Sequence, residues 1–496
     1  MWNKKPAKVS NCLNKRPFHS DLSTIYVMAE VHNCDSRADM GVLPHALVLP
    51  YPAQGHVIPL MELSHCLVDH GFRITFVNTE FNHDRVVAAL QIDGTMEQIN
   101  LVSVPDGLDQ EEDRNDLGRL TEGLMKTMPL CLEELIRKSS EAGDRITCMI
   151  VDESIAWALE IAKKMGLRPA AFWPASAQLL ATLLSIPELT SKGVIDADGA
   201  ATRQEMFQLG PGMPPMNTAH FVWNCIGDRR TQCTVFNCIL DNNRAIEISE
   251  FVICNSFKEI EEPVFASAPR ILPVGPLLTG LRPRRPAGHF WPEDTTCMSW
   301  LDEQPLSSVI YASFGSFTIF DRRQFQELAL GLEATGRPFL WVVRPDLTTA
   351  SGDAYPPGFE ARVAGRGRMV AWSPQHRVLA HPSVGCFLSH CGWNSTMEGI
   401  SNGVLFLCWP YFADQFLNQS FICDVWKVGL RLMPDESGIV KQERIKSKVE
   451  ELLGDEEMRS KALLLKDTAH RNISRGGSSS QNLQAFVDAM KTSTKD

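Results

Sequence analysis

The chain has 496 residues, of which 44% are hydrophobic, and its formal net charge is −11. The length predicts two or three domains, and the acidic balance gives no global support for binding nucleic acid. The 14 cysteines form no CxxC pair, and no stretch reaches the ~18 uninterrupted apolar residues of a membrane helix. We therefore expect reduced thiols in a cytoplasmic protein that is neither a disulfide-built secreted domain nor a membrane-spanning chain.

Residues 1–42 are polar and show no sustained periodicity. Their start is basic, but Asp21 and Glu30 argue against a transit peptide, because such peptides are poor in acidic residues. We expect a disordered N-terminal extension, or an upstream start codon with Met28 or Met40 as the real start.

Short apolar runs alternate with helical periodicity over residues 43–268, which we expect to form the N-terminal domain. The expected strands are 46–49, 73–77, 99–104, 148–151 and 169–172. The expected helices are 56–70, 121–138 and 154–165, and residues 210–245 are expected to be irregular. Repeated strand–helix alternation predicts a parallel sheet that is covered on both faces.

A stretch rich in Pro, Gly and Arg follows at residues 273–292, and it predicts an interdomain linker, which we place at 269–295. Its basic cluster, 282–285, is framed by Pro283 and Pro286. We interpret this cluster as a solvated loop rather than as a phosphate-binding patch.

The alternation restarts in residues 296–475, which predict a second, C-terminal domain. The expected strands are 309–312, 339–343, 369–372, 384–388 and 404–408. The first expected helix starts at a capping box of Asp321 with Gln324 and ends near Gly336. The other expected helices are 394–401, 414–427 and the tail from 441 onward. We expect residues 476–496 to form a C-terminal helix that packs back on the first domain.

Two such alternating regions predict an α/β fold with two doubly wound, Rossmann-like domains that face each other across a cleft. Open α/β sheets bind ligands beyond the carboxyl ends of their strands, so two facing sheets would bind two ligands. That favours a two-substrate transferase, although a dehydrogenase fits the same outline. A dinucleotide oxidoreductase would need GxGxxG after the first strand, where this chain has Ala53-Gln54-Gly55-His56.

One segment, WSPQHRVLAHPSVGCFLSHCGWNSTMEGISNGVLFLCWPYFADQ, is dense in polar and aromatic residues and suits a nucleotide diphosphate sugar. Trp372 can stack a base. Gly392 permits close backbone approach at a helix N-terminus, whose free N–H groups favour phosphate. The other candidate polar groups are His390, Asn394 and Ser395 as donors, Glu398 as acceptor for ribose hydroxyls, and Asp414 and Gln415 for sugar hydroxyls.

This segment resembles the signature box of plant secondary-product glycosyltransferases that use UDP-sugars, the family 1 enzymes of the GT-B type. It matches in length, in the opening WxPQ, in the central HxGxNSxxE and in the closing DQ. The resemblance extends to the motifs PYPAQGH, FVNTE, CNSF, PVGP and ASFGS, and it therefore spans essentially all of residues 43–490.

The resemblance implies roles for individual residues. For the donor, the resemblance implies that Trp372 and the backbone of Ser373 contact uracil and that Gln375 and Glu398 contact the ribose. The residues implied for the diphosphate are His390, Asn394, Ser395, Gly315 and Ser316. The residues implied for the sugar are Trp393, Asp414 and Gln415. In this family a closing Gln accompanies glucose, so Gln415 indicates UDP-glucose. Two residues depart from the family: Leu405 replaces a usual proline, and Pro174 replaces a Ser or Thr whose hydroxyl can reach the sugar.

Glycosyl transfer to a hydroxyl needs a base, and histidine has a suitable pKa near 6.5. His56 follows the first predicted strand and Asp152 follows the fourth, so both belong at the same edge of the sheet. Both positions match the family's dyad, with His56 as base and Asp152 as orienting carboxylate. The competing interpretations are a structural histidine, Asp152 as a helix N-cap, and Glu153 in place of Asp152.

We therefore expect an inverting transferase that moves glucose from UDP-glucose to a hydroxyl or carboxyl of a small apolar plant metabolite, such as a phenolic or flavonoid. The alternative is a non-catalytic UDP-sugar-binding regulatory protein on the same fold. The resemblance implies no metal, and the sequence shows no cluster of His and carboxylate residues at metal spacing; UDP-glucose is a co-substrate, and no cofactor is expected. We expect a monomer, with the acceptor bound near Trp157 and along 173–184 and 210–245.

Overall fold

The computed structural model describes residues 43–90, 98–278, 290–345, 347 and 354–492. The predictions for residues 1–42, including Met28 and Met40, and for the basic cluster 282–285 lie outside these ranges. Within them, no helix combines the length and the apolar character needed to cross a membrane.

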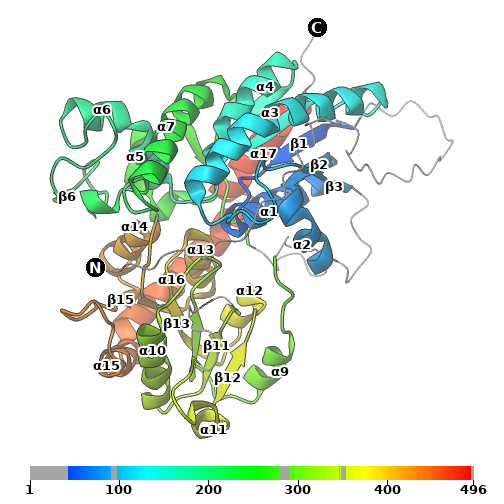
Figure 1. Ribbon diagram of the computed structural model, residues 1–496. Coiled ribbons are helices and arrows are strands. Elements are labelled where there is room, and N and C mark those ends of the chain that lie inside the picture. Colours follow the sequence, from blue (N-terminus) through cyan, green and yellow to red (C-terminus); the bar gives the residue numbers. More distant parts are fainter. Residues whose placement is uncertain (1–42, 91–97, 279–289, 346, 348–353, 493–496) are drawn as a thin grey trace, which may run out of the picture. The chain divides into compact units, whose positions relative to one another are not determined.

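The first half of the chain is built on a seven-stranded sheet with the order β3-β2-β1-β4-β5-β8-β9, in which all pairs are parallel (Figure 1). Its strands are β1 (His45–Leu49), β2 (Arg73–Thr79), β3 (Ile99–Val104), β4 (Cys148–Asp152), β5 (Arg168–Trp173), β8 (Phe251–Cys254) and β9 (Ile271–Pro273). The central strand β1 is buried at every position, as expected for a parallel strand covered on both faces. The five predicted strands are confirmed to within two residues, and β8 and β9 were not predicted.

Helices cover both faces of this sheet and fill the connections. They are α1 (Gln54–Asp69), α2 (Glu80–Leu90), α3 (Leu117–Glu141), η1 (Glu153–Ala158), α4 (Leu159–Lys164), α5 (Ala177–Leu184), α6 (Ile186–Ser191), η2 (Thr218–His220), α7 (Arg229–Ala245), η3 (Ile246–Ile248), η4 (Lys258–Ile260) and α8 (Glu262–Ser267). A short antiparallel pair, β6 (Met206–Phe207) with β7 (Met216–Asn217), lies outside the main sheet.

Two predictions for this half are wrong. Residues 210–245 are not irregular, because Asp228 caps α7 by accepting from the Thr231 amide, and the helix buries a face that includes Phe236 and Ile239. The single helix expected over 154–165 divides into the 3₁₀ turn η1 and the short helix α4. Ile155 lies within η1 and has non-helical dihedral angles, so a regular helix does not run through this turn.

The second half is built on a six-stranded parallel sheet with the order β12-β11-β10-β13-β14-β15 (Figure 1). Its strands are β10 (Val309–Ser313), β11 (Phe339–Val342), β12 (Gly367–Val370), β13 (Val384–Ser389), β14 (Leu405–Cys408) and β15 (Gly429–Arg431). Its helices are α9 (Thr296–Asp302), α10 (Arg322–Ala334), α11 (Phe359–Val363), α12 (Gln375–Leu379), α13 (Trp393–Asn402), α14 (Gln415–Ser420), η5 (Phe421–Val425), α15 (Gln442–Leu453), α16 (Glu456–Ile473) and α17 (Ser478–Lys491). The predicted α/β class with two Rossmann-like domains is confirmed.

Three local predictions in this half need correction. Strand β12 ends at Val370, two residues before Trp372, whose carbonyl accepts from the Asp294 amide instead of pairing within the sheet. The capping box at Asp321 is half formed, because Asp321 caps Gln324 while the Gln324 side chain bonds the backbone of Val440. The helix expected over 414–427 passes from α14 into the π-helical turn η5.

The last helix, α17, returns to the first sheet. Phe486 meets Phe251 of β8 edge to face, with 5.5 Å between ring centroids, and Asn482 donates to the Pro273 carbonyl at 2.8 Å. Phe486, Val487 and Met490 are buried in the core on one face of that sheet.

Candidate active site

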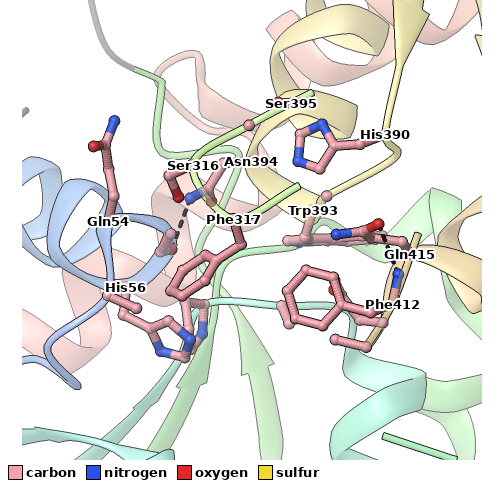
Figure 2. A pocket seen from close by; sticks show the side chains of 18 of the residues that line it. Gln54, His56, Ser316, Phe317, His390, Trp393, Asn394, Ser395, Phe412 and Gln415 are labelled. Carbon is pink, nitrogen blue, oxygen red and sulfur yellow. Dashed lines mark hydrogen bonds between the residues drawn. The ribbon is translucent and has the colours of Figure 1, made fainter. Parts of the chain in front are cut away.

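A cavity of about 360 Å³ is lined by residues from both sheets. The segments that line it follow the carboxyl ends of parallel strands β1, β4, β5, β10, β12, β13 and β14, where open α/β sheets bind their ligands. Figure 2 shows His56 approaching this space from one side and His390, Trp393 and Gln415 from the other. All 15 residues that the sequence nominates are near the cavity, and 14 of them line it directly, the exception being Asp152.

Asp152 does not line the cavity itself but is hydrogen-bonded to His56, which does. The Nδ1 atom of His56 lies 2.8 Å from Oδ2 of Asp152. The Asp152 side chain is fully buried, whereas that of His56 is 26% exposed. The other carboxylate oxygen of Asp152 accepts from the Ser154 amide at 2.9 Å and so begins η1. The orienting role and the N-cap role, which compete in the sequence, are thus compatible in one side chain.

The surroundings of His56 decide its protonation. Burial alone would lower the pKa of His56, but the charge and hydrogen bond of Asp152 and the charge of Asp414 outweigh burial and raise this pKa above its usual 6.5. The neighbouring Glu153 is also buried, and burial together with the charge of Asp152 raises its pKa to about 8. Glu153 therefore holds its proton at neutral pH, and Asp152 is the carboxylate that pairs with His56.

A hydrogen-bonded network joins the polar side chains beyond β12 and β13. Gln375 Nε2 donates to Ser395 Oγ at 2.8 Å and to Glu398 Oε2 at 2.7 Å. Tyr311 Oη lies 2.9 Å from Ser373 Oγ and donates to Gln375 Oε1 at 3.1 Å. The network holds Gln375 and Glu398 side by side, so that their oxygens can meet the adjacent hydroxyls of a ribose.

The loop between β13 and α13 packs an imidazole against two glycines. A Cβ atom at Gly315 or at Gly392 would lie 2.5 Å from Nε2 of His390, and Gly315 has a φ of +66°. Burial, with a further contribution from the charge of Arg344, lowers the pKa of His390 to about 4. His390 is therefore neutral, and its buried Nδ1 has no hydrogen-bond partner among the described residues. The free amides at the start of α13 lie beside it, as at many phosphate sites.

Helix α13 also bonds directly to the loops of the first sheet. Asn394 Nδ2 donates to the Gly55 carbonyl at 2.7 Å (Figure 2), and Trp393 Nε1 donates to the Asn255 carbonyl at 2.7 Å. Gly55 directly precedes His56. The first bond holds the start of α13 against the segment that carries the histidine, and the second holds it against the segment after β8.

The segment after β14 supplies the last two nominated residues. Asp414 Oδ2 accepts from Asn418 Nδ2 at 2.7 Å, and its side chain makes no capping bond to the backbone of α14. Gln415 Oε1 accepts from the amides of Tyr411 and Phe412 at 2.7 and 3.1 Å (Figure 2). Both side chains line the cavity, and these bonds fix their orientation.

Similarity to known proteins identifies the family of this chain. Residues 294–472 match the family model described as "UDP-glucoronosyl and UDP-glucosyl transferase". Over 467 residues, the chain is 43% identical to UDP-glycosyltransferase 83A1 of Arabidopsis thaliana, covering 90% of this chain and 97% of that protein. The chain belongs to the plant UDP-glycosyltransferase family. It is also 35% identical to linamarin synthase 1 of Manihot esculenta, over 90% of this chain and 96% of that protein.

Solved structures agree with this membership. A UDP-glucosyltransferase from Polygonum tinctorium that is capable of glucosylating indoxyl has a TM-score of 0.78 at 29% identity, over 91% of this chain and 100% of that one. UGT2 of Phytolacca americana, solved with UDP-2fluoro-glucose and pterostilbene, has a TM-score of 0.76 at 27% identity, with the same coverage. This UDP-glycosyltransferase therefore shares the GT-B fold of these enzymes.

Trp372 of this UDP-glycosyltransferase lines the cavity and also has an aromatic neighbour. Trp291 stacks on it with 5.0 Å between ring centroids and 24° between planes. One face of the Trp372 indole is therefore covered by protein. Trp291 lies in the predicted linker, and no sequence pattern indicated this contact.

The sequence missed several residues that build the transferase's site. Tyr311 is a lone tyrosine in the apolar strand β10, and a buried tyrosine normally needs a hydrogen-bond partner, so this signal was present. Buried Arg344 bonds the carbonyls of Gly315 and Thr318 and so holds the loop after β10. Phe317 and Phe412 meet edge to face across the cavity, with 6.0 Å between ring centroids (Figure 2).

Proposed function

We propose that this transferase moves glucose from UDP-glucose to a hydroxyl group of a small apolar plant metabolite, such as a phenolic or flavonoid, with inversion at the anomeric carbon. The observation that carries the proposal is the 2.8 Å contact between His56 Nδ1 and Asp152 Oδ2 at the wall of a cavity shared by both sheets. With Nδ1–H donated to Asp152, Nε2 is the ring nitrogen that can accept a proton.

In the proposed reaction the acceptor oxygen attacks the anomeric carbon while His56 takes its proton. The bond between the anomeric carbon and the diphosphate oxygen breaks, and UDP leaves with the electron pair. The amides at the start of α13, with neutral His390, Asn394 and Ser395, would stabilise the charge on the leaving diphosphate. Attack on the face opposite the leaving group gives inversion.

The donor would lie along the second sheet. We propose that Trp372 stacks the uracil and Ser373 pairs with its edge, and that the Gln375–Glu398 pair holds the ribose. Gly315 and Ser316 would help to bind the diphosphate. Trp393, Asp414 and Gln415 would contact the sugar, and Gln415 favours glucose. The described residues contain no group of three or more His, Cys, Asp or Glu side chains placed to hold a metal ion.

The acceptor would bind at the first-sheet end of the cavity, which is mostly apolar. Its apolar wall consists of Leu117, Leu179, Leu183, Val222, Ile226, Val235 and Ile239. A relative that is 32% identical, the 7-deoxyloganetin glucosyltransferase of Gardenia jasminoides, is named for a small plant product. One chain supplies both halves of the cavity and its described cysteines are free, which supports a monomer acting in the cytoplasm.

The test is to incubate the purified protein with UDP-glucose and a mixture of phenolics and to measure UDP release. Proton NMR of the product should show a β-glucoside, because the glucose of UDP-glucose is α-linked and inversion changes this configuration. An α-linked product would contradict inversion. Binding of UDP-glucose without any UDP release across a broad acceptor panel would instead support a binding protein on the same fold.

A prediction concerns the glycine beside His390. We expect Gly315→Ala to weaken UDP binding by about tenfold, about 1.4 kcal/mol, because the new methyl group would lie 2.5 Å from His390 Nε2 and displace the ring. The matched control is Gly336→Ala, at a φ of +67° with no atom within 4 Å. Both changes carry a similar backbone cost of about 1–2 kcal/mol. Calorimetric titration with UDP should therefore separate them, and equal affinities would show that the His390 ring does not contribute to binding.

A further inference from the structure

Glu153 is a buried carboxyl group that the proposed transfer step does not use. The residue is 2% exposed, it lines the cavity, and its Oε1 atom has no hydrogen-bond partner within the described part of the chain. Leaving a buried polar atom without a partner is costly unless a ligand supplies one. A carboxyl in this state at the wall of a substrate cavity therefore points to a polar group on the substrate.

The position of Glu153 assigns it to the acceptor rather than to the donor. It directly follows Asp152 and begins η1, which packs against α7. Its charge would act on Cys238 of α7, which also lines the cavity. The proposed donor residues come from the second sheet, whereas Glu153 belongs to the first sheet beside the apolar wall. Two further polar residues line the cavity on this side, Thr121 of α3 and Asn242 of α7.

The charges around Glu153 determine its form. None of the described residues that line the cavity is Lys or Arg, and Arg344 is bonded to the loop after β10 on the donor side. The charge that acts on Glu153 is that of the Asp152 carboxylate on β4, which is hydrogen-bonded to His56, and Glu153 in turn acts on the Cys238 thiol on α7. Burial and Asp152 raise the pKa of Glu153 to about 8, so near pH 7 the carboxyl offers an O–H donor.

Resting on the proposed glucosyl transfer, we infer that Glu153 determines acceptor specificity by donating a hydrogen bond to a second oxygen of an uncharged alcohol or phenol, and that it disfavours carboxylate acceptors. A carboxylate acceptor would place another negative charge beside Asp152, and none of the described residues that line the cavity is a Lys or Arg that could offset it. An uncharged hydroxyl acceptor gives up its proton to His56 during transfer and avoids that cost. The product class is therefore a glucoside rather than a glucose ester.

The test uses three acceptors that share one ring system and one reacting hydroxyl: 2-naphthol, 2,6-dihydroxynaphthalene and 6-hydroxy-2-naphthoate. Their affinities are measured by titration calorimetry in the presence of UDP, and their kcat and KM are measured with UDP-glucose. For the wild type we expect the diol to bind about threefold to tenfold more tightly than 2-naphthol and the naphthoate to bind more weakly than 2-naphthol. Turnover of 2-naphthol tests the proposed function, and the binding ratios test Glu153 separately.

Three variants separate a binding role from a structural one. Glu153→Leu should abolish the preference for the diol. Glu153→Gln, which keeps a donor and cannot ionise, should retain that preference and should bind the naphthoate better than the wild type does above about pH 8, where the wild-type carboxyl ionises. Glu160→Leu, an exposed change on α4, is the control and should leave all ratios unchanged. The effect should lie in KM and affinity, with kcat for the diol within about twofold of wild type.

A pH profile adds a readout that needs no apolar variant. As pH rises through about 8 the wild-type carboxyl ionises, so wild-type binding of the naphthoate should weaken further relative to that of 2-naphthol, whereas in Glu153→Gln this ratio should stay constant. An unchanged diol preference in Glu153→Leu, a pH-independent ratio in the wild type, or tighter wild-type binding of the naphthoate than of the diol would each overturn the inference.

Discussion

His56→Ala should reduce kcat by about 10³-fold or more while leaving the affinity for UDP within about twofold of wild type. The loss is expected because the acceptor hydroxyl is a poor nucleophile while it keeps its proton, and the Nε2 atom of His56 is the proposed proton acceptor. UDP affinity should be preserved because the donor groups belong to the second sheet. Single-turnover kinetics and calorimetric titration with UDP measure the two quantities.

The control for this variant is His381→Ala. His381 lies between Trp372 and Gln415, in the segment that holds most of the proposed donor residues, but its ring bonds Ser383 and Asp302 and does not line the cavity. Turnover of His381→Ala should remain within about twofold of wild type. If His56→Ala retained a rate comparable to that of His381→Ala, His56 would not be the base.

Asp152→Asn is expected to lower kcat/KM on the order of 10³-fold, by analogy with the loss of an orienting carboxylate in other triads. The fold should survive, because asparagine keeps an oxygen that can accept from the Ser154 amide, as Asp152 does now at 2.9 Å. What the substitution removes is the negative charge that fixes the histidine tautomer and stabilises the imidazolium formed during transfer. Thermal melting checks the fold, and initial rates check the loss.

The pH profile of Asp152→Asn carries the more specific expectation. The base acts when neutral, so wild-type kcat/KM should rise with pH through the His56 pKa, which lies above 6.5. Asp152 is a main cause of that raised pKa, and without its charge the opposing effect of burial lowers the pKa of His56. The acidic limb of the profile should therefore move to lower pH in the variant. A limb that stays in place would mean that Asp152 does not set the protonation of His56.

The fold was largely predictable because parallel strands buried on both faces appear as short apolar runs. Strands β1, β3 and β4 were placed to within one residue for this reason. Helix α7 was not predicted because it follows a Gly- and Pro-rich interval, and because two charged residues, Arg229 and Arg230, come directly after its N-cap Asp228. The strand ending before Trp372 was extended too far, since an apolar run does not show which partner its backbone will bond.

The site was predictable where one segment carries it and less so where the fold assembles it. The residues from 372 to 415 could be nominated together because they are close in sequence. Contacts such as Tyr311 with Ser373 and Trp291 with Trp372 join residues from separate elements, and only the packing reveals them. Glu153 was considered only as a competitor of Asp152, because sequence shows neither its burial nor the charge beside it.

The two side-chain bonds from α13 to the carbonyls of Gly55 and Asn255 make the assembly of the site depend on how the two halves of the enzyme meet. Each sheet has its own buried strands, so we expect each to keep its fold when these two bonds break. We therefore expect mild urea to loosen the contact between the halves first. Activity should then be lost at a lower urea concentration than the helical signal in circular dichroism. Dilution would restore activity at once, since nothing would have to refold.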